Sequence, residues 1–166
     1  VLNLISTDSS NGKSYLSQEL ANYWISIGLQ VRRLTYDEDF LADDSRFIMS
    51  TSIKDLCPDI LPDEIAIVEY PNLNDHSVPA SLLNMGTVNL MVTRANRTWK
   101  DIDQKALKEV QSQLENQDSL YMYLTESNRY AVEEFVGQLP PYTRFSNFVY
   151  RLSQLGLTAT ENNHAS

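Results

Sequence analysis

Short apolar runs recur along the chain, and turn-forming residues separate most of them. Runs of about five residues have the length of strands, and continuous apolar character is typical of strands that are buried on both faces of a sheet. The pattern therefore predicts strands at Val1–Ile5, Gln30–Tyr36, Glu64–Tyr70, Thr87–Thr93 and Leu120–Leu124.

Helical periodicity occupies several of the segments between and after these runs. An apolar stripe that stops at Gly28 predicts a first helix, from Leu16, Leu20, Tyr23, Trp24 and Ile27. A second stripe, which has Thr98 as a candidate N-cap and Asp101 three residues later, comprises Trp99, Ile102, Ala106, Leu107, Val110 and Leu114. Two later helices are expected near Tyr130–Gln138 and Phe145–Leu155.

Strands that alternate with amphipathic helices predict an α/β fold with a mainly parallel sheet and helices on both of its faces. The length of 166 residues favours one domain, which we place at residues 1–158. The polar end of the chain predicts a disordered tail at residues 159–166. In such a fold, ligands bind at the carboxyl ends of the strands.

Composition and charge narrow the function classes. The net charge of −9 would repel a phosphate backbone and argues against a nucleic-acid partner. Cys57 is the single cysteine, which favours a reducing compartment over a disulfide framework. No apolar run approaches the roughly 20 residues that span a bilayer, and the chain starts at Val1 without a signal peptide, so we interpret it as a fragment of a longer protein.

The strongest chemical signal follows the first predicted strand, where the chain reads Ser6-Thr7-Asp8-Ser9-Ser10-Asn11-Gly12-Lys13-Ser14. It matches the phosphate-loop pattern G-x-x-x-x-G-K-[ST], except that Thr7 replaces the first glycine. Backbone N–H groups from Ser10 to Ser14 could surround a β-phosphate, and Lys13 could reach the β- and γ-oxygens. The Ser14 hydroxyl could bind Mg²⁺. An N-capped, serine-rich turn is the alternative.

The order of elements resembles the cytoplasmic domain of bacterial tyrosine kinases that regulate capsular and exopolysaccharide export, which are P-loop ATPases. The matching segments are Asp8–Ser14, Val31–Asp37, Ile65–Pro71 and Val92–Thr98. The resemblance implies a P-loop NTPase-like fold, ATP or ADP with Mg²⁺ as cofactors, and other subunits of a polysaccharide export complex as partners. It also implies a place at the cytoplasmic face of the inner membrane, with any anchor upstream.

Residue roles follow from this resemblance, and so do the departures. Lys13 and Asp37 are the candidate catalytic residues, although Thr35 stands where the family has its first aspartate. Glu69 replaces the Walker B aspartate and would join Ser14 as a metal ligand. Asp37 and Glu69 close strands that are expected to neighbour the first. The candidate nucleotide-binding residues are Ser10, Asn11, Gly12, Lys13, Ser14 and Thr125, the last in place of an asparagine that reads adenine.

Three functions remain open at this point. Loss of one general base costs roughly 10²- to 10⁴-fold in rate, so we favour a nucleotide-binding domain of a polysaccharide chain-length or export regulator, with weak or absent catalysis. The alternatives are an active ATP-dependent tyrosine kinase and a nucleotide-free docking platform. Because Lys13 would lie exposed at a loop edge, its replacement is expected to change fold stability by about 0.5 kcal/mol or less.

Overall fold

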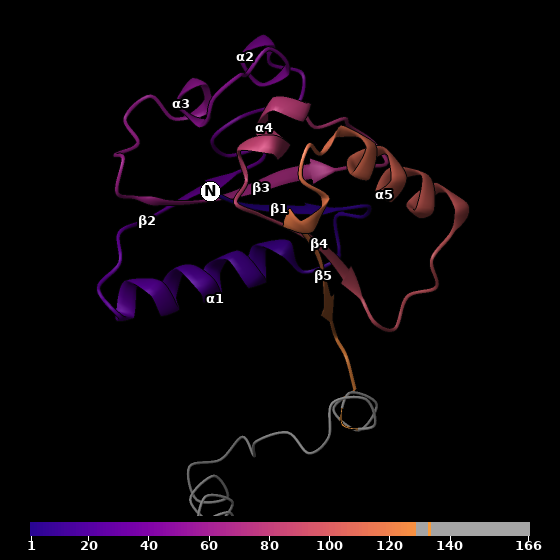
Figure 1. The fold of residues 1–166 in the computed structure, drawn as a ribbon. Coiled ribbons are helices and arrows are strands. Elements are labelled where there is room, and N and C mark those ends of the chain that lie inside the picture. The colour runs from indigo at the N-terminus through magenta and orange to yellow at the C-terminus, as the bar shows by residue number, and fades with distance from the viewer. Residues whose placement is uncertain (129–132, 134–166) are drawn as a thin grey trace, which may run out of the picture. The chain divides into compact units, whose positions relative to one another are not determined.

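The computed structural model describes residues 1–128 and residue 133, and their contacts group residues 1–126 into one compact unit. The elements, in chain order, are β1 (Leu2–Ser6), α1 (Lys13–Ser26), β2 (Val31–Thr35), α2 (Ser45–Ile48), α3 (Ile53–Leu56), β3 (Ile65–Asn72), α4 (Ala80–Met85), β4 (Val88–Arg94), α5 (Asp101–Gln113), a 3₁₀ turn at Gln117–Ser119 and β5 (Leu120–Thr125) (Figure 1). The helices expected near Tyr130–Gln138 and Phe145–Leu155, and the tail at 159–166, lie outside the described residues.

The five predicted strands are confirmed, and all of them pair in parallel in the order β2-β3-β1-β4-β5. One detail of the expected arrangement is wrong. β3 does neighbour β1, but β2 lies beyond β3 and does not touch β1. The chain skips a position when it crosses from β1 to β2, and β3 then fills the gap. The carboxyl ends of the parallel strands still share one edge.

Helices cover both faces of this sheet, as the sequence predicts (Figure 1). On one face, α1 packs Leu16 and Ala21 against a cluster that includes Leu4 and Ile67. The short helices α2 to α4, together with α5, cover the opposite face around Tyr70 and neighbouring core residues. Leu2 and Leu4 of β1 belong to the cluster beneath α1, whereas Ile5 belongs to the opposite cluster, as the two-residue period of a strand requires. Position along a strand therefore decides which side chains meet α1.

The helix ends agree with the sequence in one case and differ in another. α1 ends at Ser26, and Gly28 follows in the left-handed region at a φ of 88°, as a glycine terminator should. The expected N-cap of α5 at Thr98 is wrong, because the helix begins two residues after Trp99 and its cap is Lys100. The carboxylate that completes this cap belongs to Asp103, since its oxygen accepts the N–H of Lys100 at 2.9 Å.

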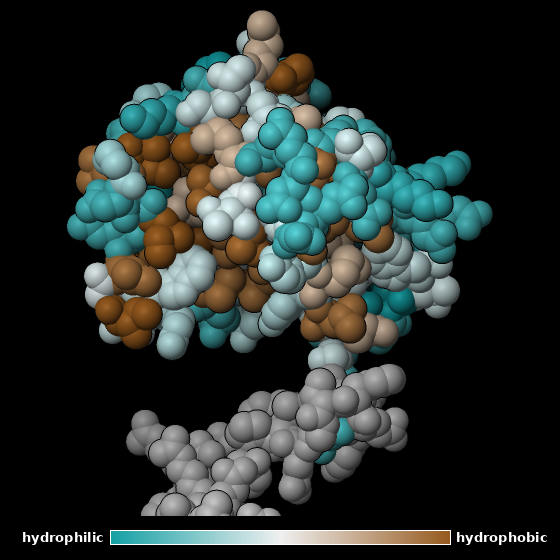
Figure 2. Space-filling view, in the orientation of Figure 1, coloured by the Kyte–Doolittle hydropathy of each residue, from teal (hydrophilic) through white to brown (hydrophobic). Residues whose placement is uncertain are grey.

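β5 forms one edge of the sheet and exposes apolar side chains on both sides. The exposed residues are Tyr121, Met122, Tyr123 and Leu124. Hydrophobic residues are also exposed on the surface around α1, whereas α5 presents mainly hydrophilic residues (Figure 2). None of the helices within residues 1–128 is long and apolar enough to cross a membrane.

Candidate functional site

The loop between β1 and α1 leads straight into the helix at Gly12 and Lys13, where the sequence predicts it. Gly12 is the N-cap residue and adopts a φ of 85°, a conformation that residues other than glycine rarely adopt. Its carbonyl accepts the first helical hydrogen bond, from Leu16 N–H at 3.0 Å. The first turn of α1 therefore starts at the carboxyl edge of a parallel sheet, the place where backbone N–H groups can receive an anion.

Thr125, the expected adenine contact, lies at the end of β5 and supports the loop. Its hydroxyl donates to the carbonyl of Asn11 at 3.0 Å, and a Cβ on Gly12 would lie 3.4 Å from its methyl group. Asn11 itself is fully buried and its amide donates to Val92 O at 3.2 Å. The side chain of Asn11 therefore holds the loop against β4 and is not presented to a ligand.

Lys13 is buried, which corrects the expectation of an exposed lysine. Only 7% of it is accessible, and its ammonium donates to the Ser6 hydroxyl at the end of β1. The side chain therefore folds back over the loop towards the edge of the sheet. Burial lowers the pKa of Lys13 to about 8, although the charges of Glu69 and Asp8 act in the opposite direction.

Among the residues that the structure describes, the buried ammonium has no anionic partner at ion-pair distance. Within residues 1–128, every carboxylate oxygen that lies 4.0 Å or less from a basic side-chain nitrogen is paired with an arginine and not with Lys13. A buried cation that is bonded to a neutral hydroxyl is costly, because the lost hydration is only partly replaced. The arrangement is therefore electrostatically incomplete and suited to an incoming anion.

Glu69, at the carboxyl half of β3, is 2% exposed and already has two partners. Arg33 of β2 forms an ion pair with its Oε1 at 2.8 Å, and the Ser17 hydroxyl of α1 hydrogen-bonds to the same oxygen. Arg33 also donates from Nε to Ser17 at 3.1 Å, so the three side chains form a closed triangle. Ser17 also links this triangle to the first turn of α1, because its Oγ lies within hydrogen-bond distance of Ser14 O, at 3.1 Å.

A cleft of about 190 Å³ brings several expected site residues together. It is lined by Ser9, Lys13, Ser14, Thr35, Tyr36, Asp37, Glu69, Tyr70, Pro71 and Asn72. Asp37 is exposed there and adopts a φ of 74°, and the half-buried Thr35 occupies the position of the missing aspartate. The cleft therefore offers one exposed carboxylate and one buried cation.

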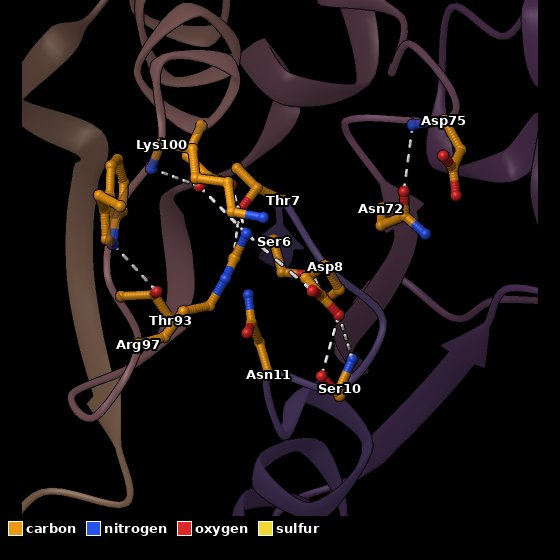
Figure 3. A network of polar contacts seen from close by, with 12 residues as sticks. Ser6, Thr7, Asp8, Ser10, Asn11, Asn72, Asp75, Thr93, Arg97 and Lys100 are labelled. Carbon is orange, nitrogen blue, oxygen red and sulfur yellow. Dashed lines mark hydrogen bonds and ion pairs between the residues drawn. The ribbon is translucent and has the colours of Figure 1, made fainter.

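Asp8 occupies part of the loop that the sequence assigns to phosphate. Its Oδ1 accepts the backbone N–H of Ser10 at 3.0 Å and the Ser10 hydroxyl at 2.9 Å (Figure 3). These bonds, the backbone one foremost and together with Arg97, hold the pKa of Asp8 below its ordinary value. In this conformation, the carboxylate of Asp8 binds a loop N–H group that would otherwise be free for a phosphate oxygen.

Arg97 fixes the other side of the loop to α5. It donates to Thr7 Oγ1 at 3.1 Å and to both oxygens of Asp103 at 2.9 and 3.0 Å, and it lies 4.0 Å from Asp8 (Figure 3). Asp103 is fully buried. Burial acts to raise the pKa of Asp103, but hydrogen bonds from Thr7, Lys100 N–H and Arg97 outweigh it, and the pKa is lowered.

Mg²⁺ fits poorly among these residues. Of the expected ligands, Glu69 is committed to Arg33 and Ser17, and Ser14 supplies only a neutral hydroxyl. Within the described part of the chain, no group of three His, Cys, Asp or Glu residues lies close enough to hold a metal. Mg²⁺ is usually held by one or two carboxylates together with substrate phosphates, and the buried carboxylate of this cleft is already paired with Arg33.

Sequence reasoning missed Arg33, Ser17, Arg97 and Asp103. A signal for Arg33 was present, because it lies two residues before Thr35 and must share a strand face with it. Arg97 and Asp103 gave no comparable signal, since their contact depends on where α5 begins. The candidate site thus contains two arginine–carboxylate pairs that flank a buried lysine.

Comparisons of the chain with protein-family models, with curated proteins and with solved structures found no match.

Proposed function

We propose that this domain binds the phosphate groups of a nucleotide, ATP or ADP, at the loop from Ser10 to Ser14. The observation that carries the proposal is the buried ammonium of Lys13, which lies at the N-terminus of α1 without an anionic partner among the described residues. A phosphate would supply the missing charge and would also accept the free N–H groups of the first turn.

The size of the cleft is consistent with phosphate groups and not with a whole nucleotide. Its volume is about 190 Å³, whereas pockets that enclose a complete small ligand typically measure about 300–1,000 Å³. The phosphates would occupy the cleft beside Lys13, and the sugar and base would lie on the surface outside it. We accordingly expect weak selectivity for the base, with Thr125 engaged by the loop.

Isothermal titration calorimetry with ATP and ADP tests this proposal. Replacement of Lys13 as Lys13→Ala should weaken binding roughly 10- to 150-fold, the range for hydrogen bonds to charged groups. Lys54→Ala is the matched control, because Lys54 is an exposed lysine on α3. An absence of binding by the unmodified chain at millimolar nucleotide, or equal binding by Lys13→Ala, would refute the proposal.

Catalysis is proposed to be weak or absent. Thr35 cannot act as a carboxylate base, and Glu69 is held in an ion pair with Arg33. An incubation with labelled ATP should transfer no more label to the protein than a Lys13→Ala control does. Label above that control would favour the alternative, an active tyrosine kinase.

The biological setting is proposed from the resemblance alone. We propose a cytoplasmic, membrane-associated domain of a regulator of capsule, exopolysaccharide or lipopolysaccharide assembly, with other subunits of that complex as partners. The exposed apolar residues of β5 favour a second candidate, a docking platform that uses no nucleotide. Calorimetry separates the two, because only the first requires heat from nucleotide binding.

A further inference from the structure

From the ion pair between Arg33 and Glu69, we infer that the site binds nucleotide phosphates without a divalent metal. The inference rests on the proposed function and specifies the chemistry of that same site. In this site, Arg33 neutralises Glu69, the one buried carboxylate that lines the cleft. A bridging metal ion would otherwise have to neutralise that charge.

Glu69 is the buried carboxylate that lines the cleft. An unpaired, buried carboxylate beside a phosphate would repel it strongly, because the effective dielectric constant at a buried site is far below that of water. A divalent ion bridging the two groups would remove this repulsion. Here the guanidinium of Arg33 already lies 2.8 Å from Glu69 Oε1, and Ser17 bonds to the same oxygen.

Arg33 is held in place independently of any ligand. Its three nitrogens donate to Glu69, to Ser17 and to Gln18 Oε1, the last at 2.6 Å. Two of these partners belong to α1, the helix whose N-terminus would receive the phosphate. The guanidinium is therefore fixed between β2, β3 and α1, and it does not have to move when a ligand binds.

Arg33 is a positioning residue, because it does not line the cleft. Lys13 does line it and is the cation that would touch the phosphate. The two cations thus have separate tasks: Arg33 neutralises Glu69, and Lys13 binds the ligand. With both in place, no metal ion is needed to shield the phosphate from the charge of Glu69.

Titration of the unmodified chain with ADP, once in EDTA and once in excess Mg²⁺, is the primary test. The two dissociation constants should agree within about threefold. A difference of that size corresponds to less binding free energy than one typical hydrogen bond contributes. A dissociation constant in Mg²⁺ that is roughly tenfold lower or more would overturn the inference and leave the proposed function standing. Absence of binding in both conditions refutes the proposed function itself.

Substitution of Arg33 supplies the second test. Arg33→Gln should weaken ADP binding in EDTA by roughly tenfold or more, and Mg²⁺ should restore much of the loss because Glu69 is then free to meet it. Arg33→Lys keeps the charge and should remain independent of metal. If Arg33→Gln binds equally in EDTA and Mg²⁺ with unchanged affinity, the assignment to Arg33 is wrong.

Arg32→Gln is the matched control, because it removes the same charge from the neighbouring position of β2. Arg32 points to the opposite side of the strand and pairs with Glu64 at 3.4 Å and Asp59 at 3.5 Å. Its replacement should leave both dissociation constants unchanged. A new metal dependence in Arg32→Gln would show that overall charge, and not the pair with Glu69, sets the requirement for metal.

Discussion

Lys13 is a buried cation that burial penalises, and this makes the stability of the protein depend on pH. Its pKa is about 8 in the folded protein against an ordinary value of 10.5. Between these values the unfolded chain binds more protons than the folded one, so the free energy of unfolding rises with pH over that window. Below pH 8 the full penalty applies, which is about 3 kcal/mol.

Lys13→Met should therefore stabilise the protein at pH 7 and remove the rise in stability between about pH 8 and 10.5. Urea unfolding at several pH values measures both effects, with Lys54→Met as the exposed control. The same variant should bind nucleotide less well, so stability and ligand affinity would change in opposite directions. A loss of stability at pH 7 would show that the ammonium stabilises the fold and that its burial carries no net penalty.

Asp8 competes with a phosphate for the loop. Its carboxylate accepts the N–H of Ser10 and adds a negative charge where an anion should bind. Asp8→Asn keeps an acceptor for Ser10 but removes the charge, so ADP should bind roughly fivefold more tightly, as expected for about 1 kcal/mol of relieved repulsion. Calorimetry checks this against Asp63→Asn, which alters an exposed carboxylate outside the site. Unchanged or weaker binding by Asp8→Asn would contradict the competition.

At the scale of elements, α5 is joined to the loop through its first turn. Asp103 caps the helix by accepting the N–H of Lys100, and it also holds Arg97 with both oxygens. One side chain therefore fixes the start of the helix and the position of the arginine that contacts Thr7. Helix capping alone typically contributes about 1 kcal/mol to the free energy of unfolding. Removal of one partner from the buried ion pair should cost more than that.

Asp103→Asn should destabilise the protein by about 3 kcal/mol, because it leaves the guanidinium of Arg97 largely buried without its counter-charge. Asp101→Asn changes an exposed carboxylate in the same helical turn and should cost about 0.3–1 kcal/mol through the helix dipole. Chemical unfolding of the two variants gives the comparison. Similar losses would mean that the pair with Arg97 contributes little to the folded state.

For the whole molecule, local pattern was enough to predict the elements but not their arrangement. β3 is buried on both faces from Ala66 to Pro71, and its first half therefore appears as the continuous apolar run Ile65–Val68. The place of β2 beyond β3 was not predictable in this way, because it depends on how the chain crosses the sheet and not on the composition of either strand. The start of α5 was missed for a related reason, since Asp103 and not Asp101 meets the cap.

The candidate site was predictable to a similar extent. The spacing of Gly12 and Lys13 after a strand predicted their position at the start of α1. It did not predict the burial of Lys13, which depends on Ser6 and the edge of the sheet, or the pair of Arg33 with Glu69. Arg33 and Glu69 are separated by 36 positions and meet only through the register of β2 and β3. Charge pairing across strands is a property of the assembled sheet.

All residues of the candidate site belong to the compact unit at residues 1–126. A chain that ends after Asn128 should therefore fold cooperatively and bind ADP with the dissociation constant of the full chain, because the core clusters on both sheet faces remain. The midpoint of thermal unfolding should shift by less than about 4 °C, the effect of about 1 kcal/mol in a domain of this size.

The competing outcome is aggregation through the apolar side chains on β5, from Tyr121 to Leu124. Serine substitutions at Met122 and Leu124 that restore solubility would identify β5 as the cause, whereas loss of ADP binding by a soluble, folded truncation would show that the site extends beyond residue 128.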